Sequence, residues 1–132
     1  NSKVSGIAFT THPVTRDPNQ MIIEAGWGLG EAIVSGQVTP DAYVIDKEDN
    51  SLIDINVNKQ DMMIVPVKPR GVKKMTVKKS DQAKQKLTGS NIIELVKILR
   101  RIESHYKTPQ DIEWAYDGKK FFITQTRPIT TL

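Results

Sequence analysis

Residues 111–128 read DIEWAYDGKKFFITQTRP. Two apolar-rich segments flank an Asp-Gly turn, a pattern that predicts an antiparallel hairpin. An acid, an amide and an arginine stand on it at Glu113, Gln125 and Arg127. Carboxylate and amide oxygens suit a hard divalent cation, and a guanidinium suits a phosphate. The stretch therefore indicates a phosphoryl-transfer site, with an ordinary surface hairpin as the alternative.

The register of this hairpin decides between the two interpretations, because partners in an antiparallel pair point to the same side. A two-residue loop pairing Tyr116 with Lys119 would put Glu113 and Gln125 on opposite faces. A loop of three or five residues would bring them together. The metal interpretation thus predicts a loop of odd length, against the usual two-residue preference after Asp-Gly.

The rest of the chain predicts an α+β fold with a mostly antiparallel sheet. The segment 89–105 carries apolar residues at helical spacing, so it is expected to be the one long helix, and a short helix is expected near 28–35. Thr88, or Asn91 with Glu94, can cap the long helix. The further expected strands are 4–10, 21–25, 38–46, 51–58, 62–67 and 72–77.

Composition excludes several classes of protein. The 132 residues contain no cysteine, so disulfides and cysteine-based metal sites are impossible. That fits a reducing compartment, and we expect the chain in the cytoplasm. The sequence has no run of about 18 apolar residues and does not open on a charged and then apolar stretch, so neither a membrane span, a signal peptide nor a membrane partner is expected. The length fits a single domain over 1–132, and its beginning at Asn1 leads us to expect a piece of a longer protein.

Charge is unevenly spread, because residues 59–86 hold nine Lys or Arg against two acids. This basic segment is interpreted as a solvated face, or alternatively as a surface that meets nucleotide phosphates or a partner domain. No aromatic residue lies within it to stack on bases, so nucleic acid is not an expected partner. The isolated His12 and His105 have no partner at metal-ligand spacing and are interpreted as structural or solvent-facing.

The glycine-rich segment 26–36 is a second candidate site. Small residues before a helix let backbone N–H groups approach an anion, which makes Gly28 and Gly30 candidate cofactor-binding residues. The spacing matches neither common nucleotide fingerprint, and packing or a turn is the alternative role. Glu24 precedes the segment and Glu31 lies within it, and Glu24 is the candidate ligand of the two.

Several segments in chain order carry a family resemblance. They are SGIAFT at 5–10, HPVT at 12–15, IEAGWGLGEA at 23–32, PD at 40–41, PQDIEWA at 109–115 and TQTRPIT at 124–130. Together they resemble the nucleotide-binding domain shared by phosphoenolpyruvate synthase (pyruvate, water dikinase), pyruvate phosphate dikinase and rifampicin phosphotransferase.

The resemblance implies the second subdomain of an ATP-grasp fold, with ATP and Mg²⁺ as cofactors. It implies that Glu113 and Gln125 belong to the metal site and that Arg127 contacts the phosphates as the catalytic residue. The first subdomain is expected before Asn1, and a phosphohistidine domain and a pyruvate-binding barrel after Leu132.

The family reaction passes the β-phosphoryl of ATP through a phosphohistidine to pyruvate or another acceptor. Neither histidine of this chain stands in the motif expected for that group, so the phosphoryl acceptor is expected to lie elsewhere. Without the other half of the nucleotide site, the isolated piece is expected to bind ATP weakly and to be inactive. The rivals are an antibiotic phosphotransferase of the rifampicin type and a non-catalytic interaction domain that uses the basic 59–86 segment.

Overall fold

The computed structural model describes residues 3–129, so the end of the 124–130 motif lies outside the described residues. The helices are α1 (Glu31–Val34) and α2 (Gly89–Tyr106), with a 3-10 turn η1 (Lys79–Asp81). The strands are β1 (Val4–Phe9), β2 (Gln20–Trp27), β3 (Asp41–Asp46), β4 (Ser51–Asn56), β5 (Met62–Pro66), β6 (Val72–Thr76), β7 (Gln110–Tyr116) and β8 (Phe121–Pro128). The expected α+β fold is confirmed.

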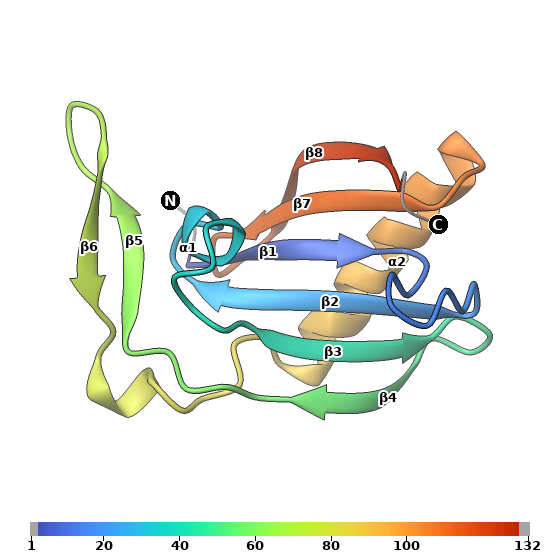
Figure 1. The fold of residues 1–132 in the computed structure, drawn as a ribbon, viewed down its shortest axis with the longest axis horizontal. Helices are drawn as coiled ribbons and strands as arrows, with labels where there is room; N and C mark the ends of the chain where they lie inside the picture. Colours follow the sequence, from blue (N-terminus) through green and yellow to red (C-terminus); the bar gives the residue numbers. More distant parts are fainter. Residues whose placement is uncertain (1–2, 130–132) are drawn as a thin grey trace.

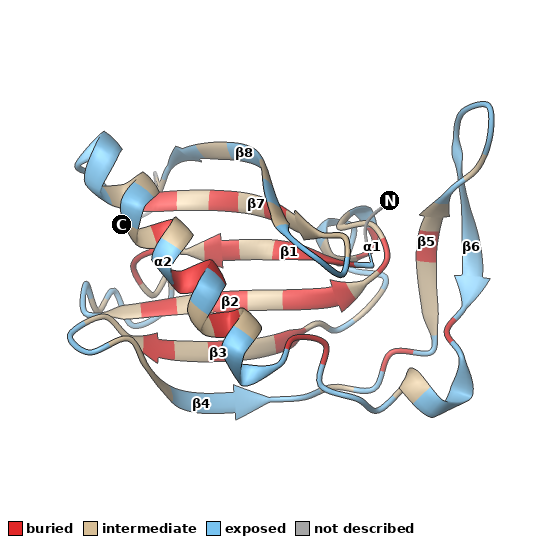
Figure 2. Ribbon diagram, turned by 180° about the vertical axis from the view of Figure 1, so that it is seen from behind, coloured by how far each residue is buried: buried red, intermediate tan, exposed pale blue. Residues whose placement is uncertain are grey.

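Six strands form one antiparallel sheet in the order β4-β3-β2-β1-β7-β8, and β5 pairs with β6 separately (Figure 1). Helix α2 lies diagonally across one side of the large sheet (Figure 2). We call the other side, which carries Glu24, Glu113 and Gln125, the open face. In the part of the chain that the structure describes, no long helix covers it.

The core lies between the sheet and α2, as the helical spacing predicts. Ile92, Leu95, Val96 and Leu99 are the buried residues of the helix. Shortening a buried Leu or Ile of this kind to Ala costs roughly 2–5 kcal/mol, so this layer fixes the strands that carry the open face. The strand residues of the same cluster are Val4, Ala8, Met21, Ile23, Ala25, Tyr43, Ile45, Ile112 and Trp114.

Both ends of α2 are capped. The Thr88 hydroxyl accepts the Asn91 backbone N–H at 3.2 Å, which satisfies a donor that the first turn leaves free. Lys107 ends the helix in the left-handed conformation and donates its N–H to the Glu103 carbonyl at 2.7 Å. Within residues 3–129, neither helix is both long enough and apolar enough to cross a membrane.

Gly6 allows the central strand β1 to lie close to both of its neighbours. A Cβ at this position would come within 1.7 Å of the Glu24 carbonyl oxygen and 2.8 Å of the Trp114 ring. Such contacts are impossible for real atoms, so any larger residue would push β1 away from β2 or β7. Gly6 thereby keeps Glu24 and Glu113 on a continuous sheet.

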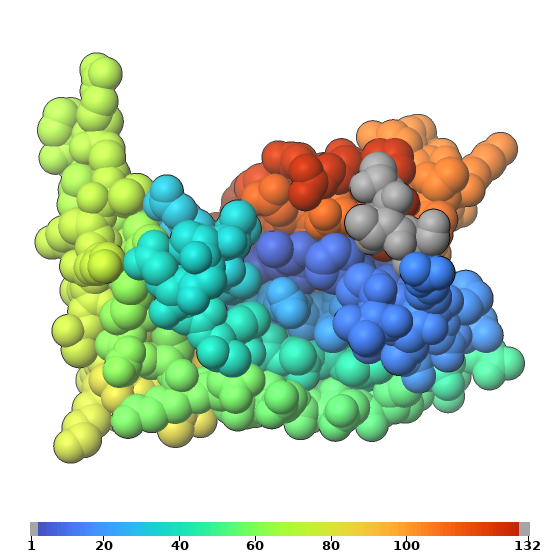
Figure 3. Space-filling view, in the orientation of Figure 1, coloured from blue at the N-terminus to red at the C-terminus, as the bar shows by residue number. Residues whose placement is uncertain are grey.

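Strands β5 and β6 form a hairpin that projects from the body of the molecule (Figures 1 and 3). We call residues 61–79 the basic arm, because its charged residues are Asp61, Lys68, Arg70, Lys73, Lys74, Lys78 and Lys79. The root of the arm is held by Gln60, which is 2% exposed. Its side-chain oxygen accepts the Trp27 backbone N–H at 2.9 Å, and its amide group donates to the Trp27 carbonyl at 3.1 Å. The arm therefore has a fixed base and an exposed outer strand.

Not all of the basic segment is solvated, which corrects part of that interpretation. The side chain of Lys86 is 0% exposed and forms a 2.8 Å ion pair with Asp41, whose side chain is equally buried. Asp41 also accepts the Tyr43 hydroxyl at 2.7 Å and the Asn58 backbone N–H at 3.0 Å. Burial, and then the bond to Asp41, raise the pKa of Tyr43. Lys86 is thus a structural cation that ties the segment after η1 to β3.

Candidate functional site

The β7–β8 hairpin brings Glu113 and Gln125 directly opposite each other on the open face. The loop between the strands is nevertheless not of odd length. Tyr116 pairs with Phe121, which leaves the four residues 117–120 in the loop. The expectation of an odd loop is therefore wrong, although the two side chains do share a face.

A β-bulge explains the difference. Trp114 pairs with Ile123 and Glu113 pairs with Gln125, so Thr124 is an extra residue without a cross-strand partner. Its hydroxyl donates to the Glu113 carbonyl at 3.2 Å. The bulge shifts the register by one residue. The side chains of β8 beyond it therefore point to the side of the sheet opposite to the one they would face without the bulge.

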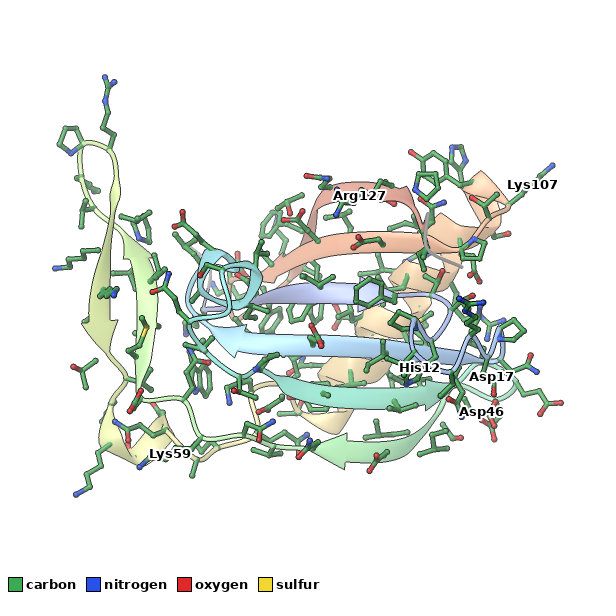
Figure 4. All side chains as sticks on the ribbon, viewed as in Figure 1. His12, Asp17, Asp46, Lys59, Lys107 and Arg127 are labelled. Carbon is green, nitrogen blue, oxygen red and sulfur yellow. The ribbon has the colours of Figure 1, made fainter. Side chains whose placement is uncertain are left out.

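Beyond this pair, Asp111 lies opposite Arg127. Arg127 Nε is 3.1 Å from Asp111 Oδ2, and the arginine side chain is 64% exposed. The guanidinium is therefore held at its base while most of it faces solvent (Figure 4). Asp111 was not a candidate site residue from the sequence, although the alternation of side chains along a strand places it on the same side as Glu113. Asp111 lies directly opposite Arg127 in the register beyond the bulge, and this position makes it the partner.

Glu24 belongs to the same row of side chains. Ile7 pairs with Glu24 on one side and with Glu113 on the other, so both acids lie on the open face. With strands about 4.8 Å apart, their Cα atoms are about 10 Å from each other. Among the described residues, the carboxylate of Glu24 has no hydrogen-bond or ion-pair partner, and burial raises its pKa above the ordinary 4.5. It is a half-buried acid available to a ligand.

A cavity of about 620 Å³ lies beside this row. The α1 segment protrudes from the sheet beside this cavity (Figure 3). The residues that line the cavity come from the glycine-rich segment, the basic arm and the β7–β8 hairpin, and include Gly30, Glu31, Pro66, Glu113 and Thr124. The cavity has room for part of an organic ligand next to Glu113.

Within the glycine-rich segment, Gly28 has a packing role. Its φ is +79°, and a Cβ there would lie 2.6 Å from the Ile64 carbonyl oxygen. Its N–H donates to the Lys3 carbonyl, and the next N–H, of Leu29, donates to Ile64. Two of the N–H groups proposed to hold an anion are therefore engaged, whereas Gly30 lines the cavity.

The donor atoms on the open face suit Mg²⁺. Glu113 and Gln125 supply one carboxylate and one amide oxygen from opposed positions. Mg²⁺ keeps several waters and accepts one or two protein ligands together with phosphate oxygens, so this pair is sufficient. Among residues 3–129, no group of three or more His, Cys, Asp or Glu gathers into a metal site of another kind.

The two histidines lie away from this site. His12 Nδ1 accepts the backbone N–H groups of Val14 and Thr15 at 3.2 and 3.3 Å, so it shapes the loop after β1. Figure 4 shows His12 and Asp17 in that loop and Arg127 apart from them on β8. His105 is exposed in the last turn of α2.

Known proteins resemble this chain over its whole length. The family model for the pyruvate phosphate dikinase AMP/ATP-binding domain matches residues 1–132. The phosphoenolpyruvate synthase of Pyrococcus furiosus is 44% identical over all of this chain and 17% of its own length. The probable phosphoenolpyruvate synthase of Methanocaldococcus jannaschii is 40% identical over all of this chain and 11% of its own length.

The rifampicin phosphotransferase of Bacillus subtilis is 41% identical over 98% of this chain and 15% of its own length. The chain thus spans less than a fifth of each of these three relatives. Because the family model covers every residue, the chain belongs to the family of pyruvate phosphate dikinase AMP/ATP-binding domains.

Proposed function

We propose that this chain is the ATP- and Mg²⁺-binding part of a dikinase that forms phosphoenolpyruvate. In the full reaction the β-phosphoryl of ATP passes through a phosphohistidine to pyruvate, and AMP and phosphate are the other products. One observation carries the proposal: Glu113, Gln125 and Arg127 stand on one open face of a nucleotide-binding family member. The lack of cysteine fits a reducing compartment, and we infer that the protein acts in the cytoplasm.

The residues divide the work by their chemistry. Bound Mg²⁺ would neutralise phosphate charge and orient the phosphate oxygens. Glu113 and Gln125 hold the metal, while Arg127 is the catalytic residue that stabilises charge on the transferring phosphoryl group. Arginines with that task are worth about 10³–10⁵ in rate. Glu24 and Gly30 are further nucleotide contacts, and Gly28 supports them through packing.

The remainder of the active site belongs to other parts of a longer protein. We assign this chain to the second subdomain of an ATP-grasp fold, which closes over nucleotide together with a first subdomain that precedes it. A phosphohistidine domain and a pyruvate-binding barrel follow it. The short span of the chain relative to its relatives supports this assignment. The 132 residues alone should then bind ATP weakly and should not hydrolyse it.

Equilibrium titration of the 132-residue chain with ATP tests the proposal. Binding should need Mg²⁺, should be lost in EDTA, and should weaken in Glu113→Ala and Gln125→Ala. Glu48→Ala is the matched control, because Glu48 is an exposed acid in the loop between β3 and β4 and does not line the cavity. Binding that is indifferent to Mg²⁺ contradicts the metal site, and ATP hydrolysis by the chain alone contradicts the expected inactivity.

Two alternatives rest on specific observations. Identity to the rifampicin phosphotransferase is close to that for the synthases, which favours an antibiotic acceptor as the second candidate. Assays of the full-length protein with pyruvate and with rifampicin distinguish these two. The exposed basic arm favours a non-catalytic docking role as the third. Salt-sensitive partner binding that survives Arg127→Ala would support it.

A further inference from the structure

The register of β8 changes once along its length, at Thr124. Before the bulge, Trp114 pairs with Ile123, and after it Glu113 pairs with Gln125. If the first register continued, Gln125 would lie opposite Ile112 instead of Glu113. Gln125 and Arg127 would then point toward α2, and the open face would lose its amide and its guanidinium. The candidate site therefore depends on whatever fixes the shifted register.

Thr126 makes a bond that only the shifted register permits. It lies opposite Ile112, and its hydroxyl donates to Gln110 Oε1 at 2.9 Å. Gln110 is 1% exposed, and its amide group donates to the Thr108 hydroxyl at 2.8 Å. The Gln110 backbone N–H in turn donates to the Thr10 hydroxyl at 2.8 Å. Thr126 is thus joined to a buried acceptor that is already held in place.

The environment of Thr126 disfavours the unshifted register. Thr126 lines a groove with Arg101, His105 and Tyr106 of α2. In the unshifted register, Arg127 would lie opposite Gln110 and face this side of the sheet. It would approach another arginine and leave the Gln110 oxygen without the Thr126 hydroxyl. Like-charge proximity and the loss of the bond between Thr126 and Gln110 both oppose that arrangement.

We propose that Thr126 is a positioning residue for the metal and phosphate site. Its bond to Gln110 fixes the bulged register, and that register keeps Gln125 and Arg127 on the face of Glu113. β-Bulges commonly re-aim side chains beside active sites, and here the bulge and the threonine after it act together. The inference deepens the proposed function and rests on it only for the identity of the ligand.

The test compares Thr126→Val with Thr126→Ser in the 132-residue chain. Valine keeps the branched shape and removes the hydroxyl, whereas serine keeps the hydroxyl. NMR of the ligand-free protein reports the register through contacts between the backbones of Glu113 and Gln125. We expect Thr126→Val to show split or broadened signals at residues 123–128. Its Mg-dependent affinity for ATP should be about two- to tenfold weaker, the range for one lost hydrogen bond. Thr126→Ser should behave like the wild type.

Thr76→Val, the same change at an exposed position of the basic arm, is the control and should alter neither readout. A single set of signals and unchanged affinity in Thr126→Val overturns the inference. Split signals in Thr126→Ser also overturn the inference. The measurement on Thr126→Ser still tests it when Thr126→Val does not fold. If the wild type fails to bind MgATP, the proposed function fails, while the contacts between Glu113 and Gln125 still test the register.

Discussion

Arg127 forms an ion pair with Asp111, with Arg127 Nε 3.1 Å from Asp111 Oδ2. This pair lies two residues along β7 and β8 from the opposed Glu113 and Gln125. The acid therefore holds the guanidinium near the proposed metal ligands before any nucleotide arrives. A side chain held in this way loses less freedom when it meets a phosphate.

Arg127→Lys should weaken MgATP binding by about tenfold, because a lysine offers a point charge in place of a planar fork. The free energy of unfolding should change little, because an exposed ion pair contributes at most about 1 kcal/mol. Titration and urea unfolding measure the two effects. Arg101→Lys, an exposed arginine on α2, is the control. Unchanged affinity in Arg127→Lys would remove Arg127 from the phosphate site.

Lys86→Met should destabilise the protein by about 3–5 kcal/mol, because it leaves the Asp41 carboxylate buried without its cation. Lys84→Met is the matched change at an exposed pair with Asp81, and it should cost less than about 1 kcal/mol. The two ion pairs are 2.8 and 3.1 Å long, so burial and not length separates them. Equal losses of unfolding free energy in Lys86→Met and Lys84→Met, measured with urea, would show that burial of the Lys86 pair carries no special cost.

Gly28→Ala should loosen the basic arm. The substitution combines a φ of +79° with a Cβ 2.6 Å from the Ile64 carbonyl oxygen. Gly36 has a similar φ of +76° and nothing within 4 Å of a Cβ, so Gly36→Ala isolates the backbone strain. We expect about 1 kcal/mol for Gly36→Ala and more than about 2 kcal/mol for Gly28→Ala. Faster hydrogen exchange at Leu29 and along β5 should accompany the second change alone.

Glu24→Gln should stabilise the protein at neutral pH. Burial raises the pKa of Glu24 above 4.5, so the folded state favours the protonated form. The stability from that form is fully present below the unfolded pKa and is lost as pH rises through the folded pKa. Glutamine does not ionise. The advantage of the variant should therefore grow as pH rises from below 4.5 and level off above the raised pKa.

Unfolding free energies across this pH range measure the effect, with Glu31→Gln as the exposed control. Glu24 has the uncharged Ile7 and Ala42 as its cross-strand partners, so neither neighbouring strand offers a charge there. A pH-independent difference between Glu24→Gln and the wild type would contradict the raised pKa.

Much of the fold follows from local pattern. The apolar spacing of 89–105 and the cap at Thr88 predicted α2, observed at Gly89–Tyr106. Short apolar segments between turn residues predicted the strands to within a few residues. These features depend on neighbours in the chain, which is why the sequence reveals them. The buried residues of the helix end at Leu99, and Tyr106 in its last turn is 51% exposed.

The register of the hairpin could not be predicted in the same way. Loop length alone cannot reveal a bulge, since the extra residue Thr124 is accommodated by contacts across the strands. The buried role of Lys86 was equally hidden, because its partner Asp41 lies 45 residues earlier in the chain. Both depend on tertiary contacts, and nothing in the local sequence distinguishes Lys86 from the exposed lysines around it.

The site residues themselves were suggested by a pattern of oxygen ligands and a guanidinium, and their common face depends on the bulge. The function of that face is the central claim. The measurement that tests it most directly is a site-resolved NMR titration of the 132-residue chain with ATP, with and without Mg²⁺. We predict Mg-dependent shifts clustered at Glu113, Gln125 and Arg127 that disappear in Glu113→Ala. Shifts gathered on the basic arm, or no shifts at millimolar ATP, would contradict the account.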